Sequence, residues 1–211
     1  MKSHKKEILL TTLLCLLPVL AGGILYRRLP ETIATHFGFN GEENGWSGRA
    51  FAVFGIPLLM AGMNLLLHFL LSADPKRRNM SPPLRAIAVW SIPITTVFVC
   101  ALTLGHALGY AVHAEIAVPL LTGLLFAAIG NYLPKTRQNY TMGIRLPWTL
   151  ASEENWNRTH RLAGFIYAAG GVGMILITLL GLWNIWLFAA LLAPLVLIPA
   201  AYSYLLYRKN I

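Results

Sequence analysis

Charged residues are scarce in this chain and are missing from its long apolar stretches. Asp, Glu, Lys and Arg make up 12% of the 211 residues, whereas soluble domains typically contain about 25%. Only two cysteines occur, Cys15 and Cys100, and both fall inside apolar stretches. They are interpreted as small buried residues, which excludes a disulfide scaffold. The composition also excludes disordered and collagen-like chains, and a polytopic membrane protein remains.

Six apolar stretches are long enough to cross a bilayer, for which about 20 residues suffice. They are predicted at Ile8–Tyr26, Ala50–Leu71, Ala86–Leu104, Ile116–Leu133, Leu162–Leu182 and Ile185–Tyr207. No segment between them is long enough for a soluble domain. We therefore predict an all-α fold, a polytopic membrane helical bundle with six transmembrane helices, in which residues 1–211 form a single membrane domain.

The 17 Lys and Arg residues are distributed unevenly among the segments between these spans. The N-terminal segment, the second and fourth loops and the C-terminal tail hold 14 of them, and the first, third and fifth loops hold three. Because Lys and Arg accumulate on the cytoplasmic side of membrane proteins, both termini are predicted to be cytoplasmic. The formal net charge of +9 then reflects topology and contact with anionic membrane lipids, and no direct nucleic-acid binding is expected.

The predicted spans contain no acidic or basic residue. Pumps and ion-coupled transporters usually keep ionisable groups inside the bilayer, so a transporter is disfavoured. His68 lies in the second span and is interpreted as an interfacial or hydrogen-bonded histidine. The fifth span contains small residues that allow close helix packing, and it is therefore expected at the centre of the bundle; they include Gly164, Gly170, Gly171 and Gly173.

The first loop, Arg27–Arg49, is predicted to lie on the outer face as a compact folded segment. It contains the turn signals Asn40-Gly41 and Asn44-Gly45. His36 and Trp46 are predicted to build its surface, with Trp46 at the level of the lipid headgroups. The spacing of His36 from the two following glutamates matches no metal-ligand pattern, so no metal site is assigned. The loop is interpreted as a headgroup-level structural loop or a peptide-contact surface.

The fourth loop, Asn131–Gly164, is predicted to be cytoplasmic and is dense in polar and aromatic residues. Thr149 or Ser152 can cap a new helix that would continue directly into the fifth span. Glu153 and Glu154 would lie in its first turn, where the helix dipole favours negative charge. On this helix, residues 153, 156 and 160 share one face.

Three interpretations of the fourth loop stay open. Its basic and aromatic residues can anchor it to lipid headgroups, or the loop can bind a protein or an anionic ligand. In the third interpretation, Glu153 or Glu154 acts with His160 in acid–base or metal chemistry. No HExxH arrangement or nucleophile signature accompanies these residues, so nothing requires an enzyme and no cofactor is expected.

Two segments of the sequence resemble a known family. The fourth loop, with the glycine before it, contains Gly130–Lys135, Asn139-Tyr140, Gly143–Arg145, Pro147–Leu150, Glu154, Trp156, Thr159, His160 and Gly164. This set of residues resembles the signature of the SdpI family of bacterial membrane proteins. Leu29–Phe37, with Gly41 and Gly45-Trp46, is similar to a membrane module often fused to that signature. We therefore expect an N-terminal module at residues 1–110 with outer loop 27–49, and an SdpI-like module at 111–211 with cytoplasmic loop 134–161.

The resemblance implies an immunity and signal-transducing protein of the bacterial plasma membrane. Such a protein would bind a secreted antimicrobial peptide toxin at its outer face and sequester a cytoplasmic transcriptional repressor at the membrane. The alternative is a membrane-embedded enzyme, or an exporter of a small amphiphile, that uses the Glu, His and Arg residues of the fourth loop. The predicted binding residues are Asn131, Lys135, Arg137, Arg145, Trp148, Glu154, Trp156 and His160 on the cytoplasmic surface, and His36 and Trp46 on the outer one.

Overall fold

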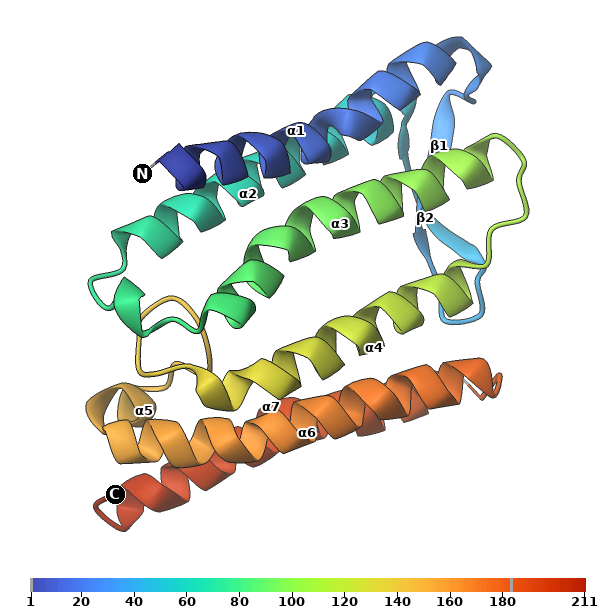
Figure 1. Cartoon of the computed structure of the whole chain (residues 1–211). Coiled ribbons are helices and arrows are strands. Elements are labelled where there is room, and N and C mark those ends of the chain that lie inside the picture. Colours follow the sequence, from blue (N-terminus) through green and yellow to red (C-terminus); the bar gives the residue numbers. More distant parts are fainter. Residues whose placement is uncertain (1, 183) are drawn as a thin grey trace. The chain divides into compact units, whose positions relative to one another are not determined.

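The structure is a computed structural model that describes residues 2–182 and 184–211 (Figure 1). Within these residues, six helices are long and apolar enough to cross a membrane, which confirms the predicted helical fold. The helices are α1 (Lys2–Leu25), α2 (Ile56–Ala73), α3 (Pro82–Ala107), α4 (Ala114–Tyr132), the short α5 (Pro147–Ala151), α6 (Glu153–Leu179) and α7 (Ile185–Arg208). One small sheet, formed by β1 (Thr32–Phe37) and β2 (Glu43–Gly48), was not predicted.

The described chain forms two compact units. Unit 1 comprises the chain up to Phe69 together with Ala88–Glu115, and unit 2 comprises Leu70–Ile87 together with Ile116–Ile211. The second loop and the helix ends beside it thus belong with the C-terminal part of the chain. The single membrane domain and its two modules, divided after residue 110, stay a prediction.

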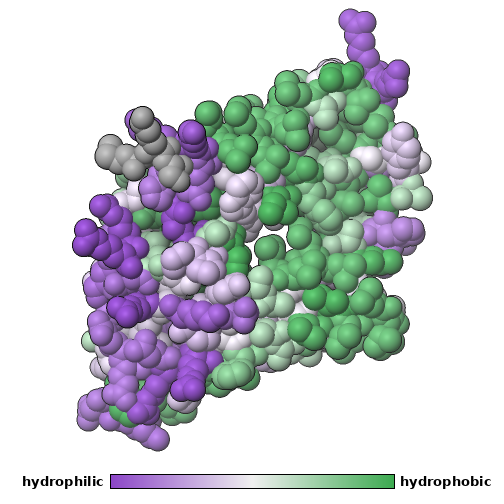
Figure 2. All heavy atoms as spheres, viewed as in Figure 1, coloured by the Kyte–Doolittle hydropathy of each residue, from purple (hydrophilic) through white to green (hydrophobic). Residues whose placement is uncertain are grey.

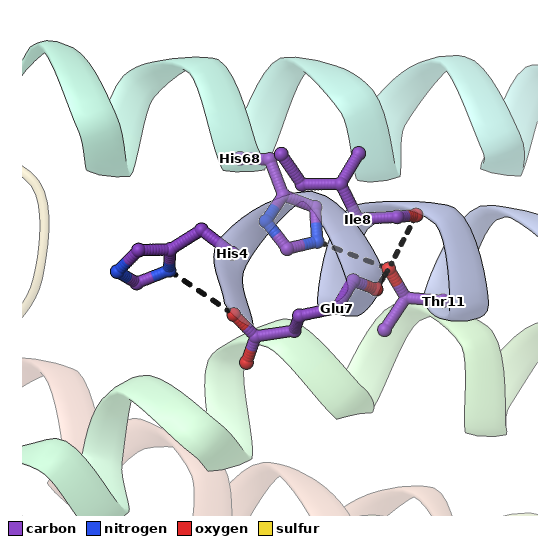
Figure 3. A network of polar contacts seen from close by, with 5 residues as sticks. All are labelled: His4, Glu7, Ile8, Thr11 and His68. Carbon is purple, nitrogen blue, oxygen red and sulfur yellow. Dashed lines mark hydrogen bonds and ion pairs between the residues drawn. The ribbon is translucent and has the colours of Figure 1, made fainter. Parts of the chain in front are cut away.

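A buried polar contact joins α1 to α2 in unit 1 (Figure 3). The Thr11 hydroxyl donates within its own helix, to the Glu7 carbonyl at 2.9 Å. Its oxygen accepts from Asn64 Nδ2 at 3.1 Å and lies 3.0 Å from Nε2 of His68. Because the single hydroxyl proton already points to a carbonyl, Nε2 of His68 is the donor to Thr11. The interpretation of His68 as a hydrogen-bonded histidine is confirmed.

The first loop folds into an antiparallel hairpin in unit 1. Its strands pair from Thr32 opposite Gly48 to Phe37 opposite Glu43. Ile33 is buried in a small core, whose other buried members are Leu29, Ala52, Val53 and Leu104. Gly41 at the tip has a φ of +80°, a conformation that glycine adopts without strain. The loop is therefore folded, as predicted, but strand pairing gives it its shape.

Arg49 ties the end of the hairpin to the end of α1. Its Nη1 donates to the carbonyls of Tyr26 at 3.2 Å and Leu29 at 2.9 Å. The guanidinium also lies 4.6 Å from the centre of the Tyr26 ring, within the range of a cation–π contact. A positive charge is favoured beside the carbonyls that a helix leaves unpaired at its C-terminal end, so Arg49 holds the end of the hairpin beside the segment that follows α1.

In unit 2, α6 lies between α4 and α7 (Figure 1). Glycines bring the backbones of α4 and α6 together: Gly164 faces the carbonyl of Gly130, and Gly171 faces the carbonyl of Gly123. On the other side of α6, Gly170 packs against the Leu195 side chain of α7. Within unit 2 the glycine-rich helix thus packs against two other helices, and its place at the centre of the whole bundle stays a prediction.

Replacing Gly171 with alanine should destabilise the packing of α4 against α6. The added methyl group would meet the carbonyl oxygen of Gly123 and the backbone of Ala127. Because backbone atoms cannot rotate away, the helices must separate, at a cost of about 1–3 kcal/mol. Thermal unfolding of the purified protein in detergent micelles should show a lower midpoint for Gly171→Ala. In the control Gly62→Ala, a methyl group meets no atom within 4 Å; equal midpoints for the two variants would contradict the close approach.

Candidate functional site

Hydrophilic residues gather at one end of unit 2, where the second loop, the fourth loop, α5 and the C-terminus lie (Figures 1 and 2). The exposed part of the fourth loop is called here the fourth-loop surface; its exposed predicted residues are Asn131, Lys135, Arg137, Arg145 and Glu154. The flanks of the helices that extend from this end are hydrophobic (Figure 2).

A stacked pair of buried aromatic side chains supports this surface from α6. The rings of Trp156 and His160 lie 3.9 Å apart at an angle of 20°, and neither residue is exposed. Nε1 of Trp156 donates to the Thr136 carbonyl at 3.0 Å. The prediction that Trp156 and His160 lie on the surface is therefore wrong: their rings are buried beneath the loop, and their polar atoms hold its backbone.

The two ring nitrogens of His160 have fixed and opposite roles. Nδ1 lies 2.8 Å from the Trp156 carbonyl and must donate, whereas Nε2 accepts from the backbone N–H of Ile144 at 2.9 Å. Only the neutral imidazole with its proton on Nδ1 satisfies both partners. Gly143 has a φ of +106° and passes close to Nε2, with which a Cβ atom would collide. His160 thus holds the middle of the fourth loop on α6.

Side-chain hydrogen bonds replace the backbone pairing that the fourth loop lacks. Oδ1 of the buried Asn139 accepts from the N–H groups of Thr141 at 3.1 Å and Met142 at 2.7 Å. The Thr149 hydroxyl accepts from the N–H of Leu146 and donates to the Ile144 carbonyl, each at 2.8 Å. Buried backbone groups are costly without partners, so these side chains allow the irregular loop to pack closely.

The second loop is fastened to the fourth by Asp74, which is 4% exposed. Oδ2 accepts from the N–H of Tyr140 at 2.9 Å and from the Thr141 hydroxyl at 2.7 Å. Oδ1 accepts from the N–H of Lys76 at 2.7 Å. Sequence reasoning did not single out Asp74, and it noted Asn139 only as part of the family resemblance, because nothing in their spacing indicates that the two loops meet.

Gln138 makes a second connection between these loops. Its Oε1 accepts from Nζ of Lys76, and its Nε2 donates to the carbonyls of Thr149 and Leu150 at 3.0 and 2.9 Å. The Asn79 side chain donates to the Gln138 carbonyl at 2.8 Å. Both the oxygen and the nitrogen of the Gln138 amide are therefore hydrogen-bonded, and these bonds hold the segment in place.

Predicted site residues at the start of α6 are held by several local contacts. The Ser152 side chain accepts from the N–H of Asn155 at 3.2 Å, which confirms the predicted helix cap and the direct continuation into the fifth span. Glu154 is exposed and forms an ion pair with Arg158 at 2.6 Å. The half-buried Trp148 packs against Tyr204 of α7, with ring centres 5.4 Å apart.

The exposed basic residues of the fourth-loop surface are also positioned. Nη1 of Arg145 donates to the Tyr140 carbonyl at 2.9 Å. Nζ of Lys135 lies 4.7 Å from the centre of the Tyr132 ring. Asn131 lies on the exposed side of the last turn of α4.

The hairpin in unit 1 presents a second group of polar and aromatic residues, called here the hairpin surface and comprising His36, Phe39, Glu43, Trp46 and His106. Oε1 of Glu43 lies 2.5 Å from Nε2 of His106, and Oε2 accepts from Nε1 of Trp46 at 2.8 Å. These hydrogen bonds, chiefly the one with His106, hold the pKa of Glu43 below its usual range. His36 instead pairs with the Asn44 side chain. His106 was missed because it lies 63 residues from Glu43.

The geometry around His160 does not favour the acid–base or metal chemistry considered for the fourth loop. Both ring nitrogens of His160 are hydrogen-bonded to backbone groups, so neither can take a proton from a substrate while the loop is folded. Over residues 2–182 and 184–211, no three His, Cys, Asp or Glu side chains come close enough to hold a metal ion.

Comparisons with known proteins agree with the resemblance of both loops. A model of the SdpI/YfhL protein family matches residues 135–203, and a domain of unknown function (DUF1648) matches residues 13–61. The chain is 27% identical over 206 residues to "Immunity protein SdpI" of Bacillus subtilis (strain 168), covering 97% of each protein. No solved structure matches the chain significantly. With its six apolar helices, the chain is a multi-pass protein of the bacterial plasma membrane, as predicted.

Replacing His160 with alanine should loosen the fourth loop. The change leaves the N–H of Ile144 without its acceptor and an empty space beside Trp156, at a cost of about 3 kcal/mol or more. Limited proteolysis should then cut between residues 134 and 146 faster than in the wild type. His160→Gln keeps an acceptor and should be cut at an intermediate rate, whereas the exposed His113→Ala should behave like the wild type. Equal cleavage of all four proteins would contradict the role of His160.

The hydrogen bonds of Glu43 in the hairpin surface should be lost below pH 4.5, the ordinary carboxyl pKa, because the pKa of Glu43 is lowered in the folded protein. The ionised carboxylate stabilises its contacts fully above this value, and the stabilisation is lost as the pH falls through the lowered pKa. The NMR signal of the Trp46 indole proton should therefore shift in acid. The signal should not titrate in this way in Glu43→Gln and should still do so in Glu31→Gln. A titration that persists in Glu43→Gln would assign the change to another group.

Proposed function

Because the chain belongs to the SdpI/YfhL family, we propose that it is a membrane immunity protein that protects its host from a secreted antimicrobial peptide toxin. The observation that carries this proposal is the similarity to Immunity protein SdpI along 97% of both chains. The charge distribution supports an orientation with both termini in the cytoplasm. In this orientation the hairpin surface faces the toxin, and the fourth-loop surface faces the cytoplasm.

The hairpin surface is the proposed site of toxin contact. Its Trp46 side chain is 59% exposed and Phe39 is 38% exposed, although aromatic side chains of this size usually gain free energy by burial. The hairpin is held by the Ile33 core and by Arg49, so its aromatic residues need little ordering when they bind. Rigid exposed aromatic residues are typical anchors for peptide and protein partners.

The fourth-loop surface is the proposed docking site for a cytoplasmic transcriptional repressor. Lys135, Arg137 and Arg145 are exposed on a loop whose backbone is already fixed from beneath. A preformed basic surface favours a partner with an acidic face. His160 and Trp156 contribute by holding this surface in place.

A survival assay tests the proposal. The test strain is a Bacillus subtilis strain that lacks its own Immunity protein SdpI. It expresses the wild type, Trp46→Ala or Arg145→Ala at matched membrane levels and is exposed to the toxin against which Immunity protein SdpI acts. Wild type should protect the cells. Trp46→Ala should need about tenfold more protein for equal survival, and Arg145→Ala should protect but fail to retain the repressor at the membrane.

Two control variants separate these roles from general damage. Trp186 is 82% exposed at the start of α7, and Trp186→Ala should protect like the wild type. Arg208→Ala, at the exposed end of α7, should retain the repressor. No protection by the wild type would contradict the immunity function, and full protection by Trp46→Ala would contradict only the assignment of the hairpin surface.

A further inference from the structure

A polar cavity of about 310 Å³ lies in unit 2 beside the first two turns of α6. The second loop contributes Asn79, the fourth loop contributes Arg137 and Gln138, and α6 contributes Glu153 and Asn157. All five side chains are polar, and two of them carry opposite charges. The volume is at the lower end of the range for ligand pockets, about 300–1,000 Å³, so it suits a small polar group.

The opposite charges in this cavity do not form an ion pair with each other. Within the described chain, no ion pair within 4.0 Å joins Arg137 or Glu153 to an opposite charge, whereas the neighbouring Glu154 is paired with Arg158. The Asn157 side chain, too, makes no hydrogen bond within the described residues. The cavity therefore offers a guanidinium, a carboxylate and an amide to a ligand that carries both a negative and a positive group.

The backbone around the cavity is fixed before a ligand arrives. The Arg137 N–H donates to the Asn79 carbonyl at 3.0 Å, and the Asn79 side chain donates to the Gln138 carbonyl. The amide of Gln138 is held by Lys76 and by two carbonyls of α5. A preformed site loses less conformational freedom on binding than a flexible loop would.

We infer that this cavity binds the phosphoethanolamine headgroup of phosphatidylethanolamine. Arg137 would hold the phosphate through its forked N–H groups, and Glu153 would accept hydrogen bonds from the primary ammonium. Glu153 is also the first residue of a helix that is long and apolar enough to cross a membrane. The apolar stretch of this helix begins at Leu162, so the cavity lies outside the predicted span, on the side of the membrane to which the fourth loop belongs. The assignment requires only the membrane location of the chain and does not depend on the immunity function.

The chemistry of the cavity distinguishes this headgroup from other common ones. Phosphatidylcholine has a quaternary ammonium, which cannot donate a hydrogen bond to Glu153. Phosphatidylglycerol has no positive group, and Glu153 would repel its phosphate. Anionic lipids instead suit the exposed basic residues Lys135 and Arg145, which have no carboxylate within ion-pair distance in the described chain.

Lipid titration of the purified protein in detergent, followed by native mass spectrometry, tests this inference. Short-chain phosphatidylethanolamine should bind about tenfold more tightly than phosphatidylcholine, as expected for hydrogen bonds between charged groups. Glu153→Gln keeps an acceptor oxygen but loses the charge, so it should reduce this preference, and Arg137→Gln should weaken the binding of both lipids. Glu31→Gln and Arg208→Gln are the control variants and should bind like the wild type. All four side chains are exposed, so the variants should fold.

Three results would overturn the inference. Equal binding of the two lipids by the wild type would show that the cavity does not recognise the primary ammonium. An unchanged preference in Glu153→Gln would show that another residue binds it. Soluble phosphoethanolamine that binds as tightly as the lipid would show that the ligand is a soluble amine phosphate and that the cavity is not a lipid site.

Discussion

The hydrogen bond from the Ile144 N–H to Nε2 of His160 is the contact on which the fourth-loop surface depends. It exists only when the ring is neutral and its proton is on Nδ1, the form that the Trp156 carbonyl selects. Trp156, stacked on the same ring, holds Thr136 on the other arm of the loop. A long irregular segment at the end of membrane helices must satisfy its buried backbone groups within the protein. His160 and Trp156 each provide a partner for one of these groups.

The two candidate surfaces are stabilised in different ways. Behind the fourth-loop surface, the hydrogen-bonding atoms of His160, Asp74 and Gln138 are buried, where water competes little with each contact. The hydrogen bonds of Glu43 in the hairpin surface are exposed to water, so the carboxylate can be protonated as the pH falls. The fourth-loop surface should thus keep its shape over a wide range of conditions, while the hairpin surface responds to the medium that it faces.

The spans, the Ser152 cap and the close packing of the glycine-rich helix were predictable because each depends on local patterns: apolar length, a capping residue before acidic residues, and repeated small residues. The burial of Trp156 and His160 was not predictable in the same way. Their spacing shows that they share a helix face, but it does not show that the preceding loop folds back over that face. Asp74 and His106 likewise acquire partners more than 60 residues away, and no local pattern carries that information.

Nitrogen NMR of the imidazole of His160, assigned with the His160→Gln variant, tests this account most directly. In micelles at neutral pH, Nδ1 should carry the proton and Nε2 should be unprotonated and hydrogen-bonded to the N–H of Ile144. A proton on Nε2, or exchange between the two forms as in a free histidine, would contradict the claim that this ring fixes the fourth loop.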